Sequence, residues 1–176
     1  MEILHDSEVS KIVYDPKHKI VYKTLKQKNI NTEWLTLYKQ FQKTARVVKV
    51  IDIVDKNTYS MEYIPNIITT VEKFTQSWRP EYSYIRNKNN FINLHNTFAD
   101  AWKSAMAISK TLPGKYFWSS GDLKLANIVV LKDKKDNISF KIIDADSWAI
   151  NDGYHSVDTF YQSQLKIALI MQRIVN

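Results

Sequence analysis

The sequence contains no cysteine, which excludes disulfide bonds and thiolate metal sites. A reducing cytoplasm is therefore the expected compartment, or a host cytoplasm if the protein is phage-encoded. No run of about 18 apolar residues is present, and the start MEILHDSEVSK has acidic residues where a signal peptide has basic ones. We therefore expect neither secretion nor a membrane-spanning segment.

Glycine is also scarce, with only Gly114, Gly121 and Gly153, so a glycine-rich phosphate-binding loop is missing. What is present is a chain of 176 residues, 44% of them hydrophobic, which is enough for one domain with its own core. We expect residues 1–176 to form that single domain. The net charge of +7 favours acidic partners such as nucleotides or nucleic acids, although scattered lysines are more typical of a solvated surface.

The first half of the chain alternates between strand and helix patterns. Two β-branched, aromatic-rich runs at 10–15 and 18–25 predict an antiparallel hairpin. Aromatic and aliphatic residues then recur at helical spacing over 31–41, behind a capping Asn or Thr. Further strands are predicted at 46–54 and 59–64. The expected order is therefore strand, strand, helix, strand, strand.

The second half begins with an ambiguous stretch at 65–90, where we expect loops around a short helix. A long amphipathic helix is predicted over 91–112, ended by a Pro-Gly pair. Two short apolar runs at 127–131 and 138–144 predict a hairpin joined by the polar turn KDKKDN. A final helix is expected from Ser156. These elements together predict an α+β protein.

Polar residues gather at the ends of that second hairpin. Asp122, Lys124 and Asn127 come just before the strand at 127–131, and Asp144 ends the strand that returns beside it. Phosphoryl transfer needs a carboxylate to orient the attacking hydroxyl, oxygen ligands for Mg²⁺ and a cation near the moving phosphate. These four residues can supply those groups because the hairpin returns Asp144 to the level of Asn127.

GDLKLANIVV resembles the catalytic loop D-x-K-x-x-N of the protein-kinase-like superfamily, and FKIIDADSW resembles its metal-binding strand end D-F-G. This superfamily includes protein kinases, RIO-type kinases and aminoglycoside phosphotransferase-like enzymes. The resemblance implies that Asp122 is the catalytic base and that Lys124 contacts phosphate. It also implies that Asn127 and Asp144 hold Mg²⁺, with ATP as the second cofactor.

The N-terminal half agrees with the resemblance in order and type. Lys23 in IVYKTL resembles the strand lysine that holds the α- and β-phosphates, and Glu33 resembles the helix glutamate that pairs with it. YSMEYI resembles the hinge, with Met61 as gatekeeper and the backbones of Glu62 and Ile64 facing adenine. The resemblance spans roughly residues 7–165.

The implied fold has two lobes, a small antiparallel-sheet N-lobe with the hinge at 1–64 and a reduced, mainly helical C-lobe at 65–176. The sequence departs from the family in several places. The turn SEVS at 7–10 stands where the glycine-rich loop is expected, and Ser120 stands where the family usually has His. The chain after Asp144 is short, so we do not expect the peptide-docking platform of protein kinases.

Two acidic residues near the C-terminus have roles that the sequence leaves open. Asp146 replaces the glycine of D-F-G, where it either adds a metal ligand or faces solvent. Asp158 is the candidate to brace the catalytic loop from the following helix.

The sequence therefore predicts an ATP- and Mg²⁺-dependent phosphotransferase that moves the γ-phosphate to a hydroxyl. Through the resemblance to protein kinases, Lys124 favours a Ser or Thr of a protein as the acceptor, and a small-molecule hydroxyl stays open. One alternative is a pseudokinase or nucleotide-binding regulator, because the glycine loop is missing. A second is a basic nucleic-acid-binding module, because of the net charge and the aromatic content. The sequence does not specify the oligomeric state.

Overall fold

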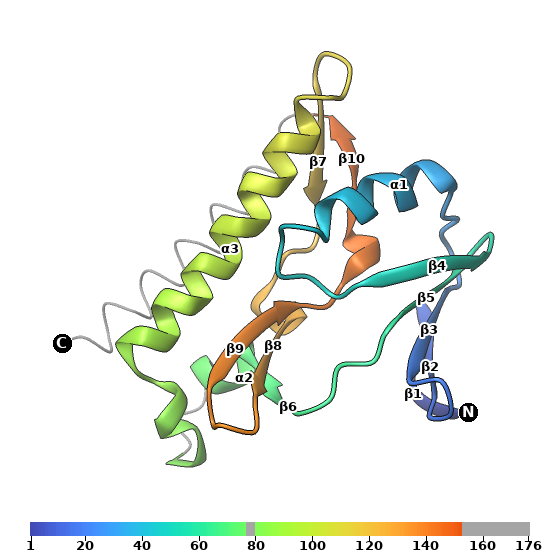
Figure 1. The fold of residues 1–176 in the computed structure, drawn as a ribbon. Helices are drawn as coiled ribbons and strands as arrows, with labels where there is room; N and C mark the ends of the chain where they lie inside the picture. Colours follow the sequence, from blue (N-terminus) through green and yellow to red (C-terminus); the bar gives the residue numbers. More distant parts are fainter. Residues whose placement is uncertain (77–79, 153–176) are drawn as a thin grey trace.

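The computed structural model describes residues 1–76 and 80–152. Its largest sheet is antiparallel and has the strand order β1-β2-β3-β5-β4 (Figure 1). The strands are β1 (Glu2–Asp6), β2 (Ser10–Asp15), β3 (Ile20–Leu25), β4 (Val50–Asp55) and β5 (Thr58–Glu62). The predicted hairpin at 10–25 is confirmed as β2 and β3, and the strands predicted at 46–54 and 59–64 are confirmed as β4 and β5, whereas β1 was not predicted.

The turn between β2 and β3 is organised by one carboxylate. Asp15 accepts hydrogen bonds from the backbone amides of Lys17 (2.9 Å) and His18 (3.3 Å), and its second oxygen lies 2.8 Å from the His18 ring. Such local side-chain bonds favour a turn over continued strand. The hydrogen bond from the His18 side chain is the main cause that lowers the pKa of Asp15.

Because the pKa of Asp15 is lower in the folded chain, its charge stabilises the fold above the ordinary value of 3.8. That contribution is lost as the pH falls through the lowered, folded pKa. We expect Asp15→Ala to lower the urea midpoint at pH 7, and the difference from wild type to shrink at pH 3. Asp15→Asn, which keeps an acceptor for the turn amides, should lose less at pH 7. A difference that stays constant across this pH range would contradict the prediction.

Helix α1 (Thr32–Phe41) follows the hairpin and confirms the predicted helix. It begins where the Asn31 side chain accepts a hydrogen bond from the amide of Trp34 at 2.8 Å. Its inner face carries Trp34, Tyr38 and Phe41, which pack against aromatic rings from other elements. The helix therefore joins the large sheet to the second half of the chain.

The second half holds a three-stranded antiparallel sheet with the order β6-β8-β9. Its strands are β6 (Ile67–Thr70), β8 (Ile128–Lys132) and β9 (Ile138–Ile142). The predicted hairpin at 127–144 is confirmed as β8 and β9. The ambiguous stretch contains β6, the short helix α2 (Val71–Gln76) and the 3₁₀ helix η1 (Pro80–Ile85).

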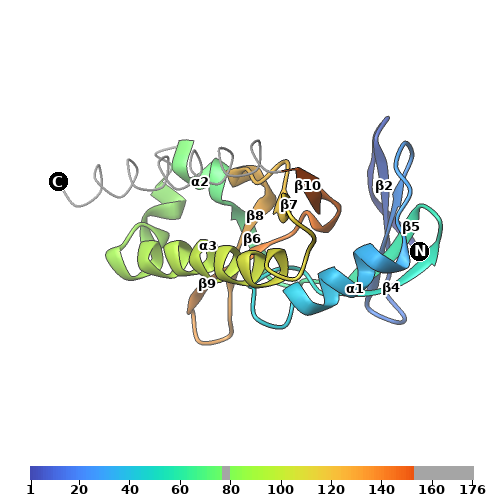
Figure 2. The same cartoon turned by 90° about the horizontal axis from the view of Figure 1, so that it is seen from above.

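Helix α3 (Lys88–Ser109) is the longest described element, and it confirms the predicted long helix with both ends shifted three residues earlier. It runs along one side of the molecule, far from the five-stranded sheet in both ribbon views (Figure 2). Asn87 caps its first turn by accepting a hydrogen bond from Asn90. Phe91, Leu94 and Phe98 are buried on its inner face, so the helix forms one wall of the core.

A second small sheet pairs β7 (Tyr116–Ser120) with β10 (Trp148–Asp152), and neither strand was predicted. Single 3₁₀ turns, η2 (Leu125–Asn127) and η3 (Ala145–Ser147), precede β8 and β10. The final helix expected from Ser156, together with the role of Asp158, lies outside the described residues.

The large sheet and the three-stranded sheet are joined by a backbone seam, which we define as residues 46–48 beside Ile142. The amide of Val48 donates to the Ile142 carbonyl (2.7 Å), and the Ile142 amide donates to the Arg46 carbonyl (3.0 Å). A parallel bridge pairs Val47 with Ile142. The seam lies two residues before Asp144.

The described fold is therefore α+β with mainly antiparallel sheets, as the sequence predicted at this level. Within the described ranges, no helix has the length and the apolar character needed to cross a membrane.

Candidate functional site

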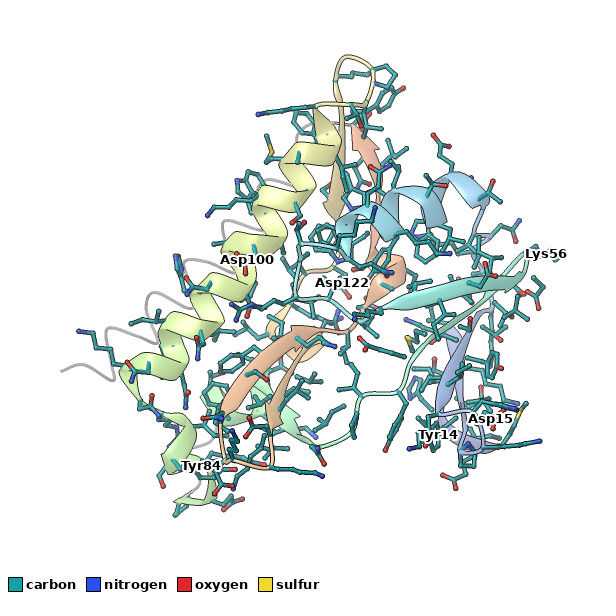
Figure 3. The ribbon with its side chains drawn as sticks, viewed as in Figure 1. Tyr14, Asp15, Lys56, Tyr84, Asp100 and Asp122 are labelled. Atoms are coloured by element: carbon teal, nitrogen blue, oxygen red, sulfur yellow. The ribbon has the colours of Figure 1, made fainter. Side chains whose placement is uncertain are left out.

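A cleft of about 710 Å³ lies between the five-stranded sheet and the loops that carry η2 and η3. Asp122, one of the residues that line the cleft, lies near the centre of the molecule (Figure 3). The cleft is lined by every residue that the sequence assigned to a site except Glu33. These residues are Lys23, Met61, Glu62, Ile64, Asp122, Lys124, Asn127 and Asp144. Residues more than 100 positions apart in the chain therefore meet in one cavity.

Lys23 lies at the inner end of the cleft, where it contacts two carboxylates. Its ammonium donates to Asp144 (2.8 Å) and to Asp146 (2.5 Å). All three side chains are largely buried: Lys23 is 12% exposed, Asp144 21% and Asp146 18%. Tyr59 lies opposite Lys23 on β5 and donates its hydroxyl to Asp146 at 2.7 Å. Charge-assisted hydrogen bonds of this kind are stronger than neutral ones, so the cluster is firmly held.

The two carboxylates differ in their protonation equilibrium. Burial raises the pKa of Asp144, and the neighbouring charge of Asp146 raises it further, so that it stays above its ordinary value despite Lys23. Burial also raises the pKa of Asp146, but Lys23 and the Tyr59 hydroxyl outweigh it and hold that pKa below its ordinary value. Burial and the Asp146 charge thus outweigh Lys23 at Asp144, whereas Lys23 and Tyr59 outweigh burial at Asp146.

The pKa of Lys23 itself reflects the same balance. Burial lowers it, but the charges of Asp146 and Asp144 and their hydrogen bonds outweigh that effect, and the net pKa is raised. The lysine is therefore a permanent cation at neutral pH, in a position to contact an anionic ligand in the cleft.

Asp122 and Lys124 lie at the open side of the cleft, where their side chains are 53% and 55% exposed. The Lys124 ammonium donates to Asp122 Oδ2 at 2.7 Å, and this hydrogen bond is the main cause that raises the pKa of Lys124. Asn127 Nδ2 donates to the backbone carbonyl of Asp122 (2.9 Å) and to Asp144 Oδ2 (3.3 Å). Asn127 thus connects the backbone of Asp122 to the carboxylate of Asp144.

A pair of serine hydroxyls fastens the loop of Asp122 to the loop of Asp144. Ser120 Oγ lies 2.9 Å from Ser147 Oγ and accepts the backbone amide of Asp122 at 3.2 Å. Ser147 Oγ in turn donates to the backbone carbonyl of Asp144 at 2.8 Å. Ser120, where the resemblance leads one to expect His, therefore takes part in positioning Asp122.

The predicted hinge residues line the outer part of the cleft. Met61 is buried, and the Glu62 carboxylate accepts from the Lys49 amide (2.8 Å) and from the Lys141 ammonium (2.7 Å). Among the described residues, the amide of Ile64 has no hydrogen-bond partner. Ile64 itself lines the cleft, so its backbone amide is a candidate donor to a ligand there.

Glu33 does not join this cluster, and its predicted pairing with Lys23 is wrong for the described structure. The side chain is exposed in the first turn of α1 and borders a separate, smaller cavity with Trp34 and Trp118. The inner face of α1 at this point is occupied by Trp34, whose indole donates to the Trp148 carbonyl at 2.9 Å. Glu33 is one residue away and thus turned about 100° off that face.

The turn at 7–10 contains no glycine, and the side chain of its first serine bonds the backbone amides of the turn. Ser7 Oγ accepts the amides of Val9 (3.3 Å) and Ser10 (3.2 Å). Lys26 donates to the Ser7 carbonyl (2.5 Å) and to Asp6 (2.7 Å). The turn is therefore closed by side chains and offers fewer free amides than a glycine-rich loop offers.

Sequence reasoning missed the contributions of Tyr59 and Ser147, and it left Asp146 undecided. The signal available for Asp146 was its place two residues after Asp144, but its partner comes from a strand more than 120 residues earlier.

Set against protein-family models and against curated proteins, the chain matches none.

Proposed function

We propose that the protein is an ATP- and Mg²⁺-dependent phosphotransferase of the two-lobed, protein-kinase-like type, which moves the γ-phosphate of ATP to a hydroxyl group. The observation that carries the proposal is the convergence of Lys23, Asp122, Asn127 and Asp144 on one cleft. Positioning and electrostatic stabilisation are the main demands of phosphoryl transfer. These four residues supply a cation, a carboxylate beside the acceptor and oxygen donors for a metal.

The outer cleft suits a nucleotide base. Val21 and Met61 line it from the sheet side and Ile143 lines it from the opposite loop, which leaves an apolar space for a flat ring. The free amide of Ile64 can donate to a ring nitrogen at its edge. The cavity volume of about 710 Å³ lies within the usual range of roughly 300–1,000 Å³ for small-molecule sites.

The donor set also suits Mg²⁺. Asn127 uses its amide nitrogen for hydrogen bonds, which leaves its oxygen for a metal, and the Asp144 carboxylate lies next to it, with Oδ2 3.3 Å from Asn127 Nδ2. Within residues 1–76 and 80–152, no three His, Cys, Asp or Glu side chains are grouped to share a metal. Mg²⁺ fits such a sparse site because one or two protein ligands plus phosphate oxygens and water complete its shell. When bound, the ion neutralises charge on the phosphates.

The proposed acceptor is a Ser or Thr hydroxyl of a protein. Asp122 and Lys124 are both about half exposed at the open side of the cleft, so a large acceptor can bring a hydroxyl to them. Asp122 would accept the hydroxyl proton, and Lys124 would lie beside the phosphate being moved.

The test is Mg²⁺-dependent incorporation of labelled γ-phosphate from ATP, into the protein itself and into proteins of a cell lysate. We expect label in the presence of Mg²⁺ and its loss when the metal is removed with a chelator. Equal labelling with and without the metal would contradict the proposed chemistry.

A second candidate, a nucleotide-binding regulator without transfer, is favoured by the closed turn at 7–10. Its Val9 and Ser10 amides bind Ser7 and are thus not free for phosphates. This candidate predicts that ATP with Mg²⁺ raises the melting temperature of the protein while no acceptor is labelled.

A further inference from the structure

The cluster around Lys23 contains two carboxylates beside a single ammonium group. Asp144 and Asp146 both accept from its ammonium, and both side chains are largely buried. Their other contacts differ. Asp144 also receives the Asn127 amide and faces the loop of Asp122, whereas Asp146 receives the hydroxyl of Tyr59. One carboxylate is therefore directed toward the polar end of the cleft and the other toward the sheet.

Asp146 is fixed by partners on the sheet side. Tyr59 is fully buried and lies directly opposite Lys23 in the β3–β5 register, so that both reach the same Asp146 oxygen from adjacent strands. The backbone carbonyl of Asp146 accepts from Lys28 at 2.6 Å. These contacts hold the residue from both its side chain and its backbone.

From this geometry we infer that Asp146, held by Tyr59, is the positioning residue of Lys23, in the role that the sequence had assigned to Glu33. The inference rests on the proposed function for its catalytic meaning. Asp144 also contacts Lys23, through Oδ1, and in this arrangement it is the carboxylate that serves the metal through the Oδ2 near Asn127, while Asp146 keeps the ammonium directed into the cleft. Asp146 is therefore not a metal ligand.

The kinetic test compares isosteric variants in the phosphate-transfer assay. Asp146→Asn is expected to raise KM for ATP roughly ten- to a hundredfold, the equivalent of one charge-assisted hydrogen bond. Its half-saturating Mg²⁺ concentration should stay at the wild-type value, whereas Asp144→Asn should raise it. Tyr59→Phe should shift KM in the same direction by about three- to tenfold. Glu33→Gln is the matched control and should leave both values unchanged.

A changed Mg²⁺ requirement in Asp146→Asn would overturn the inference, because it would make the residue a metal ligand. An unchanged KM in Asp146→Asn, or a raised KM in Glu33→Gln, would overturn it as well. A KM for Asp146→Glu that lies between those of Asp146→Asn and wild type would support it, because Glu restores the carboxylate on a side chain one methylene longer.

A double-mutant cycle in urea tests the pairing without any activity. We expect the midpoint shifts of Lys23→Met and Asp146→Asn to be strongly non-additive, because removing the lysine leaves a buried carboxylate that the second change neutralises. The shifts of Lys23→Met and Glu33→Gln should add. Additivity with Asp146, or coupling with Glu33, would refute the pairing. If the wild type transfers no phosphate, the proposed function fails, and this cycle still decides the pairing.

Discussion

Asp122→Asn is expected to lower the rate of phosphate transfer by about 10²–10⁴, the range typical of losing a general acid or base. The amide keeps the shape of the side chain but cannot accept the proton of the attacking hydroxyl. The backbone of Asp122 is held independently of its carboxylate, by Ser120 at the amide and by Asn127 at the carbonyl. The loop should therefore keep its position in the variant, and the loss should fall on kcat.

The matched control is Asp136→Asn. The wild-type Asp136 carboxylate is exposed in the β8–β9 turn, where it pairs with Lys132 outside the cleft. It should retain the wild-type rate. Nucleotide binding by Asp122→Asn, measured as the rise in melting temperature with ATP and Mg²⁺, should also stay near the wild-type value. Full transfer activity in Asp122→Asn would remove this residue from the mechanism.

Phe41→Ala is expected to cost about 3–5 kcal/mol of the free energy of unfolding, the usual range for truncating a buried Phe. Phe41 is fully buried at the end of α1. Its ring lies 4.2 Å from that of Trp148, 5.8 Å from Tyr38 and 6.3 Å from Trp118, measured between centroids. These rings come from α1, β7 and β10, so the cavity would open where three elements meet.

Urea unfolding followed by tryptophan fluorescence measures this loss. Phe41→Leu fills part of the cavity and should cost less than Phe41→Ala. Ile92→Ala, which removes an apolar side chain that is 41% exposed on α3, should change the stability by no more than about 0.5 kcal/mol. A loss below about 1 kcal/mol for Phe41→Ala would show that the aromatic cluster does not hold these elements together.

The elements that could be predicted are those whose pattern is local. The stripe of Trp34, Tyr38 and Phe41 recurs at helical spacing and is buried in α1 as expected. The hairpin of β2 and β3 combines β-branched runs with a turn that Asp15 closes. In both cases the residues that determine the element are close together in the sequence.

The strands that were missed depend on distant partners. Every residue of β1 is exposed, so the alternation that marks a half-buried strand is not present there. The β7–β10 sheet pairs Ser120 with Trp148, which lie 28 positions apart. No local pattern specifies such a pairing, because the two strands are separated in the sequence by the whole segment that contains β8 and β9.

The candidate site shows the same division. The spacing of Asp122, Asn127 and Asp144 follows from one hairpin, so a motif could indicate that they meet. The partner of Lys23 could not be found in this way, because it depends on which side of α1 faces the sheet. The large aromatic side chain of Trp34 takes the inner position, and a second carboxylate beside the lysine, in addition to Asp144, comes from η3 instead.

The seam at Ile142 has a consequence for how this protein can change over evolutionary time. Its bonds join main-chain atoms of Arg46, Val48 and Ile142, and main-chain atoms are the same whatever side chain a codon specifies. Substitutions at these positions therefore alter packing while leaving the donors and acceptors in place, proline excepted. The spacing between the two walls of the cleft therefore does not depend on the side chains at these positions, and apolar residues that face the cavity can change without breaking the seam.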